Sequence, residues 1–191
     1  SKHLPMAEQQ KLVHLKTLSS VPMEQGSAIH HLIEISLRKL RKGNPNIDIA
    51  RLESYLEAYA DTLIKQRQFF DTYYKGETVL ASDISENVLT KFKVFAASEV
   101  FAGLTELVTN GQTNVNKWVV ESNGDKYGET RIGETKAYCV IDFLYPKGDE
   151  TIIMDWKTGS ASPTHQKQLL GYILAAQTEF AINTTKTTTK A

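Results

Sequence analysis

Residues 152–159 read Ile-Ile-Met-Asp-Trp-Lys-Thr-Gly, and this stretch decides how the second half of the chain is interpreted. Three apolar residues lead directly into Asp155, so an acid follows a segment that should be buried. Lys157 comes two positions later, and the two-residue repeat of a strand places both side chains on one face. We therefore expect a carboxylate and an ammonium to project into one site at the end of a strand.

A second acid, Asp142, lies thirteen residues upstream of Asp155 and follows Val140-Ile141. The turn signal Pro-Lys-Gly-Asp at residues 146–149 separates the two acids, and a hairpin closed by that turn would place them roughly opposite each other. Two adjacent carboxylates repel unless a cation lies between them, so the pair is a candidate site for a hard cation. Asp-x-Lys alone is common, and most instances are solvated strand ends.

This combination of residue types points to a specific chemistry. A divalent ion polarises a phosphodiester and activates a water, while a lysine stabilises the charge that develops on the phosphate oxygens. An acid on one strand and Asp-x-Lys on the next strand is the arrangement that metal-assisted phosphodiester hydrolysis requires.

The first half of the chain has the pattern of helices. Apolar residues recur at a helical period from Ser27 to the basic run at residues 38–42, and Gly43 is a stop signal. A second amphipathic helix is expected over residues 47–74. A third, opened by a capping signal, is expected over residues 82–108.

The period then changes to that of strands, with a final helix. Strands are expected at residues 117–122, 136–145 and 151–156, turns at residues 123–125 and 146–149, a loop at 160–163 and a helix at 164–176. The Thr- and Lys-rich tail from residue 183 is either an edge strand or a frayed end. The outline is helices, an antiparallel meander and a helix, which is an α/β or α+β core with an N-terminal helical part.

Composition narrows the class of protein. Lys plus Arg and Asp plus Glu both number 22, and this zero net charge argues against a protein that coats nucleic acid nonspecifically. The hydrophobic fraction of 41% is enough for a real core. Cys139 is the single cysteine, which excludes a disulfide or a four-cysteine metal site within this chain. With no apolar run of membrane-spanning length, a soluble cytoplasmic protein is expected.

Four short motifs occur in order along the chain. They are Gly26-Ser27-Ala28-Ile29-His30, Val140-Ile141-Asp142, Met154-Asp155-Trp156-Lys157-Thr158-Gly159 and Gln168-Leu169-Leu170-Gly171-Tyr172. Together, over residues 26–172, they resemble the Gly-x-x-x-His, first-acid, Asp-x-Lys-Thr and Gln-x-x-x-Tyr motifs of the RecB-type nucleases in the PD-(D/E)xK superfamily.

The resemblance implies a role for each matching residue. The implied metal ligands are the side chains of His30, Asp142 and Asp155 and the backbone carbonyl of Trp156, with one or two Mg²⁺ or Mn²⁺ ions. Lys157 would position the attacking water or stabilise the transition state. Gln168 and Tyr172, four apart on one helical face, would orient the DNA strand or steady the catalytic residues.

The resemblance also implies a fold and a partner. The expected fold is a restriction-endonuclease-like core, a central mixed sheet flanked by helices. Residues 1–191 would form a single nuclease domain, with a helical part over 1–110 that carries His30 and a catalytic part over 111–191. Such a domain would act on DNA, as an exonuclease module beside a helicase domain or subunit. The chain has no Walker motif, and a single cysteine excludes the iron–sulfur cluster of some relatives.

Some alternatives remain open at this level. The chain could be a catalytically silent nucleic-acid-binding or scaffold module with the same fold, or a sequence-specific endonuclease, although the Gln-x-x-x-Tyr motif disfavours the latter. Glu121 is either a further acid of the site or a solvated strand residue. Glu34 is either a support for His30 or an exposed acid. The basic run at residues 38–42 is either a phosphate contact or a solvated helix end.

Overall fold

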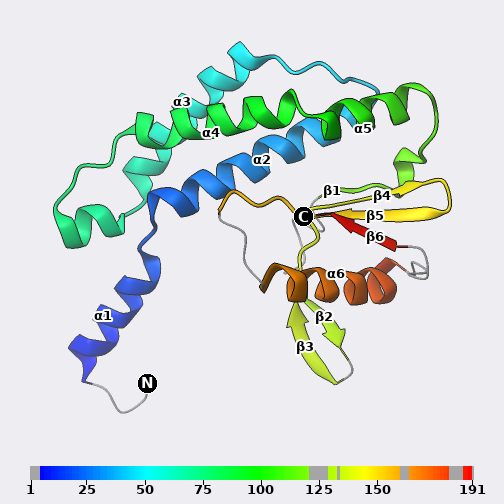
Figure 1. The fold of residues 1–191 in the computed structure, drawn as a ribbon. Helices are drawn as coiled ribbons and strands as arrows, with labels where there is room; N and C mark the ends of the chain where they lie inside the picture. The colour runs from blue at the N-terminus through cyan, green and yellow to red at the C-terminus, as the bar shows by residue number, and fades with distance from the viewer. Residues whose placement is uncertain (1–4, 121–128, 133, 160–163, 181–186, 191) are drawn as a thin grey trace. The chain divides into compact units, whose positions relative to one another are not determined.

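The computed structural model describes residues 5–120, 129–132, 134–159, 164–180 and 187–190 (Figure 1). Its helices are α1 (Met6–Thr17), α2 (Val21–Arg41), α3 (Ile49–Gln66), the π-helical turn η1 (Asp71–Lys75), α4 (Ala81–Ala96), α5 (Glu99–Thr109), the 3₁₀ turn η2 (Val115–Lys117) and α6 (Thr164–Phe180). Its strands are β1 (Val119–Val120), β2 (Glu129–Ile132), β3 (Thr135–Tyr138), β4 (Phe143–Lys147), β5 (Glu150–Met154) and β6 (Thr187–Lys190). No helix in these ranges is long and apolar enough to cross a membrane.

The chain forms two compact units. One contains residues 1–29 and 48–94, and the other contains residues 30–47 and 95–191, so α2 begins in the first unit and ends in the second. In the first unit, α3 buries Leu52, Leu56, Ala60 and Leu63. These residues recur every three or four positions, which is the spacing that gathers apolar side chains on one face of a helix.

The second unit is built around a four-stranded sheet in the order β1-β4-β5-β6 (Figure 1). Strand β4 pairs antiparallel with both β1 and β5, whereas β6 pairs parallel to β5. A two-residue turn joins β4 to β5, and Gly148 adopts a φ of 58° there. Glycine suits this turn because it has no Cβ to oppose a left-handed backbone. The sheet is therefore mixed, and the helix-rich architecture is that of an α/β protein.

Helix α6 packs against this sheet through a buried cluster. The cluster contains Ile141, Leu144, Ile153, Tyr172, Ala175 and Ala176. The small side chains of the two alanines let the helix approach the strands closely, so Tyr172 is carried to the end of β5. Burial of this apolar surface, at about 25 cal/mol per Å², is the main force that holds α6 in place.

Aromatic side chains form a second buried group in the same unit. Phe143 is fully buried, and its ring centroid lies 5.1 Å from those of both Trp118 and Tyr145 and 6.5 Å from that of Trp156. Phe143 and Tyr145 lie two positions apart on β4, so their side chains leave the strand on the same face. Phe143 and Tyr145 are therefore core residues.

Several element boundaries differ from those expected from the sequence. The helix expected over residues 47–74 ends at Gln66, because the following backbone pairs with Ser19 instead of continuing the helix. The helix expected over residues 82–108 is two helices, α4 and α5, and the strand expected over 136–145 is interrupted at 139–142. At that interruption the chain leaves its pairing with β2 and joins the sheet of β1 and β5.

Other expectations on the chain have clear outcomes. Within the Thr- and Lys-rich tail, residues 187–190 form an edge strand, β6, and the hairpin turn lies at residues 148–149 within the expected 146–149. Strand β5 ends at Met154, so Asp155 and Trp156 follow the strand rather than ending it. The sequence pattern did not predict helix α1 or the part of α2 that precedes Gly26. Glu121, the turn at 123–125 and the loop at 160–163 lie outside the described residues.

Ser98 separates α4 from α5, and its removal tests this boundary. Its Oγ accepts a hydrogen bond from the backbone N–H of Phe101 at 3.2 Å and so caps the first turn of α5. Ser98→Ala is expected to lower the free energy of unfolding by about 1 kcal/mol, because the amide loses this partner. Urea denaturation measures the change. Ser54→Ala is the control, since Ser54 caps no helix and bonds only the Ala50 carbonyl within α3; an equal loss in both variants would contradict the capping role.

Candidate active site

Asp142 and Asp155 lie next to each other at the open end of the β4–β5 hairpin. In the register of this hairpin Phe143 faces Met154. Asp142 immediately precedes the first residue of that pair and Asp155 immediately follows the second, so the two acids are the next positions across the hairpin. Asp155 is buried, with 3% of its surface exposed, and the Asp142 side chain is 13% exposed. The expected juxtaposition of the two acids is therefore present.

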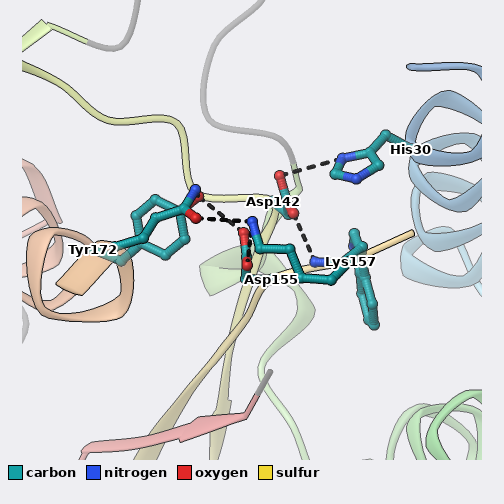
Figure 2. Close-up of polar contacts among 7 residues, drawn as sticks. His30, Asp142, Asp155, Lys157 and Tyr172 are labelled. Carbon is teal, nitrogen blue, oxygen red and sulfur yellow. Dashed lines mark hydrogen bonds and ion pairs between the residues drawn. The ribbon is translucent and has the colours of Figure 1, made fainter. Parts of the chain in front are cut away.

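Asp142 is held by two groups, one on each of its oxygens. The Trp156 backbone N–H donates a hydrogen bond to Oδ2 at 2.8 Å. Nδ1 of His30, which projects from α2 toward the hairpin in Figure 2, lies 3.5 Å from Oδ1. Both His30 and Asp142 belong to the second compact unit, so this contact forms within one unit. The structure thus brings His30, Asp142 and Trp156 together, but Trp156 contacts Asp142 through its N–H and not through the carbonyl expected as a ligand.

Asp155 belongs to a closed ring of four side chains, which we call the Asp155 ring (Figure 2). Tyr172 OH donates to Asp155 Oδ1 at 2.9 Å and accepts a hydrogen bond from Gln168 Nε2. Gln168 Oε1 in turn accepts from Lys157 Nζ at 2.8 Å, and the same Nζ lies 2.7 Å from Asp155 Oδ2. Each member therefore fixes the orientation of the next, from the strand end to one face of α6.

The second oxygen of Asp155 is balanced by charge rather than by a hydrogen bond. Within the described part of the chain, Oδ2 is buried and has no hydrogen-bond partner. Lys157 Nζ approaches it closely but outside hydrogen-bond geometry, so the ion pair alone compensates the buried carboxylate. Burial of a carboxylate without a compensating cation costs several kcal/mol, so Oδ2 requires a positive charge beside it. A metal ion could supply that charge as well as Lys157 does.

The charges of the site shift the pKa values of His30 and Tyr172. The hydrogen bond and charge of Asp142, aided by a backbone hydrogen bond with Trp156, hold the pKa of His30 above its usual value of 6.5, although partial burial opposes the shift. Burial, reinforced by the negative charges of Asp155 and Asp142, raises the pKa of Tyr172 far above its usual range. The Tyr172 hydroxyl therefore keeps its proton and acts as a hydrogen-bond donor.

The raised pKa of His30 predicts a pH-dependent contribution to stability in the metal-free protein. The folded state binds the proton more tightly than the unfolded state, so the stabilising contribution is fully present below pH 6.5. It is lost as the pH rises through the raised folded-state pKa. In the presence of EDTA, the difference in unfolding free energy between wild type and His30→Gln should therefore be larger at pH 6 than at pH 8.5. An equal difference at both pH values would contradict the His30–Asp142 pairing.

The polar residues that follow His30 on α2 have other partners. Glu34 pairs with His31 at 3.4 Å and with Arg38. Arg38 Nη2 also donates to the Val120 carbonyl at 3.3 Å, and Arg41 Nη1 donates to the Trp118 carbonyl at 3.4 Å. Both arginines of the basic run at residues 38–42 thus attach the end of α2 to residues 118–120, which contain β1. These contacts favour a structural role for the run and place Glu34 beside His31.

The donor types of the site fit a hard divalent cation. The described residues contain no group of three or more His, Cys, Asp and Glu side chains arranged to hold a metal ion. The carboxylate oxygens of Asp142 and Asp155 and the imidazole of His30 are nevertheless ligands that Mg²⁺ and Mn²⁺ accept. The Asp155 oxygen without a hydrogen bond is the clearest sign of this fit. In the structure, these donors are engaged by protein groups instead.

One contact of the site had no signal in the sequence. The Trp156 N–H orients Asp142, yet every residue except proline carries a backbone N–H, so its position depends only on how the chain turns after β5. The side chains that the motifs singled out are all present in the two groups, around Asp142 and in the Asp155 ring.

The chain matches the family described as the PD-(D/E)XK nuclease superfamily over residues 8–190. Comparisons with curated proteins and with solved structures give no match. The family match covers both compact units and includes every residue of the two polar groups described above. Along the chain, the acid before β4 (Asp142), the acid after β5 (Asp155) and Lys157 follow one another in the order of acid, acid and lysine that the family name describes. The chain therefore belongs to the PD-(D/E)XK nuclease superfamily.

Proposed function

We propose that this chain is a metal-dependent deoxyribonuclease of the RecB type, an exonuclease module of a larger helicase–nuclease that processes DNA ends. Residues 1–191 would act as one nuclease domain. Membership of the superfamily supports a metal-dependent nuclease. The observation that carries the proposal is the Asp155 ring, because it holds a lysine ammonium against a buried carboxylate at the end of β5.

His30, Asp142 and Asp155, with the backbone carbonyl of Trp156, would hold Mg²⁺ or Mn²⁺. When bound, such an ion supplies a Lewis acid for the phosphodiester and lowers the pKa of a coordinated water. These residues contribute two carboxylates against one imidazole, which is a suitable charge for a divalent ion that must also accept a phosphate oxygen.

Lys157 would supply the positive charge for the phosphate as cleavage proceeds. Its ammonium is held from two sides, by Asp155 and by Gln168, so its position is fixed before the substrate arrives. A charge that is already oriented needs no reorganisation when negative charge develops on the phosphate oxygens. Tyr172 would act on the carboxylate rather than on DNA, because it is 4% exposed and donates to Asp155. Gln168 links Lys157 to Tyr172 and is itself exposed, so it could also contact the DNA strand.

Incubation with labelled linear and closed circular DNA tests this function. With Mn²⁺ or Mg²⁺ the protein is expected to shorten linear DNA from its ends, and EDTA should stop the reaction. Degradation of linear DNA alone would support an exonuclease. Discrete cuts in circular DNA would instead assign a sequence-specific endonuclease, and intact DNA of both kinds in the presence of either metal would overturn the nuclease proposal.

A catalytically silent nucleic-acid-binding module is the second candidate. It is favoured by the engagement of His30, Asp142 and Asp155 with protein groups and by the lack of a three-residue ligand group among the described residues. Calorimetric titration with Mn²⁺ separates the two candidates. A nuclease site should give binding heat that disappears in Asp142→Ala, whereas a silent module should give no heat that depends on Asp142.

A further inference from the structure

A short aromatic segment in the first compact unit, residues 68–75, is anchored to Ser19, in the link between α1 and α2. The Ser19 backbone N–H donates to the Gln68 carbonyl at 2.8 Å, and the Phe70 N–H donates back to the Ser19 carbonyl at 2.8 Å. Between them Phe69 is buried, with 3% of its surface exposed. The π-helical turn η1 follows and ends at Gly76, whose N–H bonds the carbonyls of Asp71 and Thr72. The segment therefore has a defined backbone.

Three aromatic rings leave this fixed backbone toward solvent. Phe70 is 41% exposed, Tyr73 is 44% exposed and Tyr74 is 60% exposed. The Phe70 and Tyr74 rings are stacked, with centroids 5.7 Å apart and an angle of 11° between their planes. Tyr73 meets Tyr74 edge-on at 4.8 Å. We call Phe70, Tyr73 and Tyr74 the aromatic platform.

Folding does not account for this exposed aromatic surface. The core contact of the segment is made by Phe69, and a large ring that stays 60% exposed gains little from burial. Contiguous exposed apolar groups commonly mark binding surfaces. Rings that are already held by a fixed backbone and by each other lose little conformational freedom on binding, so the platform is suited to a partner with flat faces.

The charges around the platform are compatible with a polyanion. Lys75 Nζ is neutralised by Asp71 at 2.7 Å and lies 3.7 Å from Glu77. Two further cations lie near the segment in the sequence. Arg67 leads into it, and Lys16 lies on α1, two residues after His14, whose ring lies 5.2 Å from that of Tyr73. Lys16 and Arg67 are exposed, which leaves them available for phosphates.

From this geometry we propose that the aromatic platform binds single-stranded nucleic acid by stacking with its bases. Every base has a π-face, so aromatic stacking is tolerant of sequence, as a nuclease that degrades a whole strand requires. Bases inside a duplex are already stacked and cannot reach the rings, so single strands are preferred. The inference rests on the proposed function in one respect, that nucleic acid is the substrate; the platform itself lies outside the residues assigned to cleavage.

Binding without cleavage tests the platform directly. In EDTA, fluorescence anisotropy with a labelled fifteen-nucleotide oligo-dT measures affinity for wild type and for Tyr74→Leu, Tyr74→Phe and Tyr55→Leu. Tyr74→Leu keeps an apolar side chain but removes the π-face, so it should weaken binding by about tenfold. Tyr74→Phe should bind within about twofold of wild type. Tyr55→Leu is the matched control, because Tyr55 is also 41% exposed and stacked, on Tyr59, but lies on α3.

An abasic oligonucleotide of the same length separates stacking from phosphate attraction. It should bind wild type about as weakly as oligo-dT binds Tyr74→Leu. Equal binding of oligo-dT and the abasic strand, equal affinity of wild type and Tyr74→Leu, or no binding by wild type would each overturn the inference. Sedimentation that shows a wild-type dimer and a Tyr74→Leu monomer, with unchanged oligo-dT binding, would assign the platform to self-association instead.

The outcome is independent of the nuclease assay. Oligo-dT binding that depends on Tyr74 in a protein that cleaves no DNA would uphold the platform and reject the proposed nuclease. Metal-dependent cleavage with no effect of Tyr74→Leu on strand binding would do the reverse.

Discussion

Lys157→Met is expected to lower the rate constant for DNA cleavage by about 100- to 1,000-fold, the range seen when one preorganised charge-stabilising donor is removed. Methionine keeps most of the aliphatic stem but has no ammonium, so the phosphate loses its fixed positive partner. The Asp155 ring also opens, because Lys157 connects Asp155 to Gln168. Single-turnover cleavage of end-labelled DNA, with saturating Mn²⁺, measures the chemical step.

The matched control for this variant is Lys167→Met. Lys167 is an exposed lysine on α6, one residue before Gln168. Its substitution by methionine changes the net charge by the same amount as Lys157→Met. Its replacement should leave the rate within about twofold of wild type. A similar fall in both variants would indicate that nonspecific attraction of DNA limits the reaction. A wild-type rate in Lys157→Met would remove Lys157 from the catalytic assignment.

Phe143→Ala is expected to lower the free energy of unfolding by about 3–5 kcal/mol. Phe143 has no exposed surface and contacts the rings of Trp118, Tyr145 and Trp156, so its loss leaves a cavity that rigid neighbours cannot fill. Because Phe143 directly follows Asp142, the same change should loosen the acid. Guanidinium denaturation gives the stability, and the pKa of His30 followed by NMR should fall toward its usual value.

A smaller substitution at the same position sets the scale of this effect. Phe143→Leu keeps much of the volume and should cost less than about half as much as Phe143→Ala. Val94→Ala is a surface comparison, since Val94 is 69% exposed and should change stability by less than about 0.5 kcal/mol. A loss below 1 kcal/mol in Phe143→Ala would show that the aromatic group around this residue is not tightly packed.

The pairing of Asp142 with Asp155 could be predicted because it depends on local rules. A short turn with glycine at residue 148 closes a hairpin, and the register of a short hairpin fixes which residues face each other. The face shared by Gln168 and Tyr172 was likewise predictable, since residues four apart on a helix are neighbours. The helix of His30 followed from its apolar period, and the structure extends it toward the N-terminus.

The boundaries that were predicted wrongly depend on contacts between distant residues. The helix expected to continue past Gln66 ends there because the next residues bond to Ser19, some fifty positions earlier. The strand expected over residues 136–145 is interrupted where the chain changes strand partners. Neither partner leaves a mark on the local pattern, since a backbone N–H or carbonyl is the same in every residue except proline.

The sequence alone determined the types of side chain in the site, their order and the hairpin that brings the two acids together. Only the tertiary structure decided which partner each acid takes: His30 and the Trp156 N–H for Asp142, Tyr172 and Lys157 for Asp155. The physical reason is that each contact depends on how a separate element packs: α2 carries His30, the chain after β5 carries the Trp156 N–H and Lys157, and α6, held by burial of Ala175 and Ala176, carries Tyr172. Burial is non-directional and sums over many residues, so no motif encodes it.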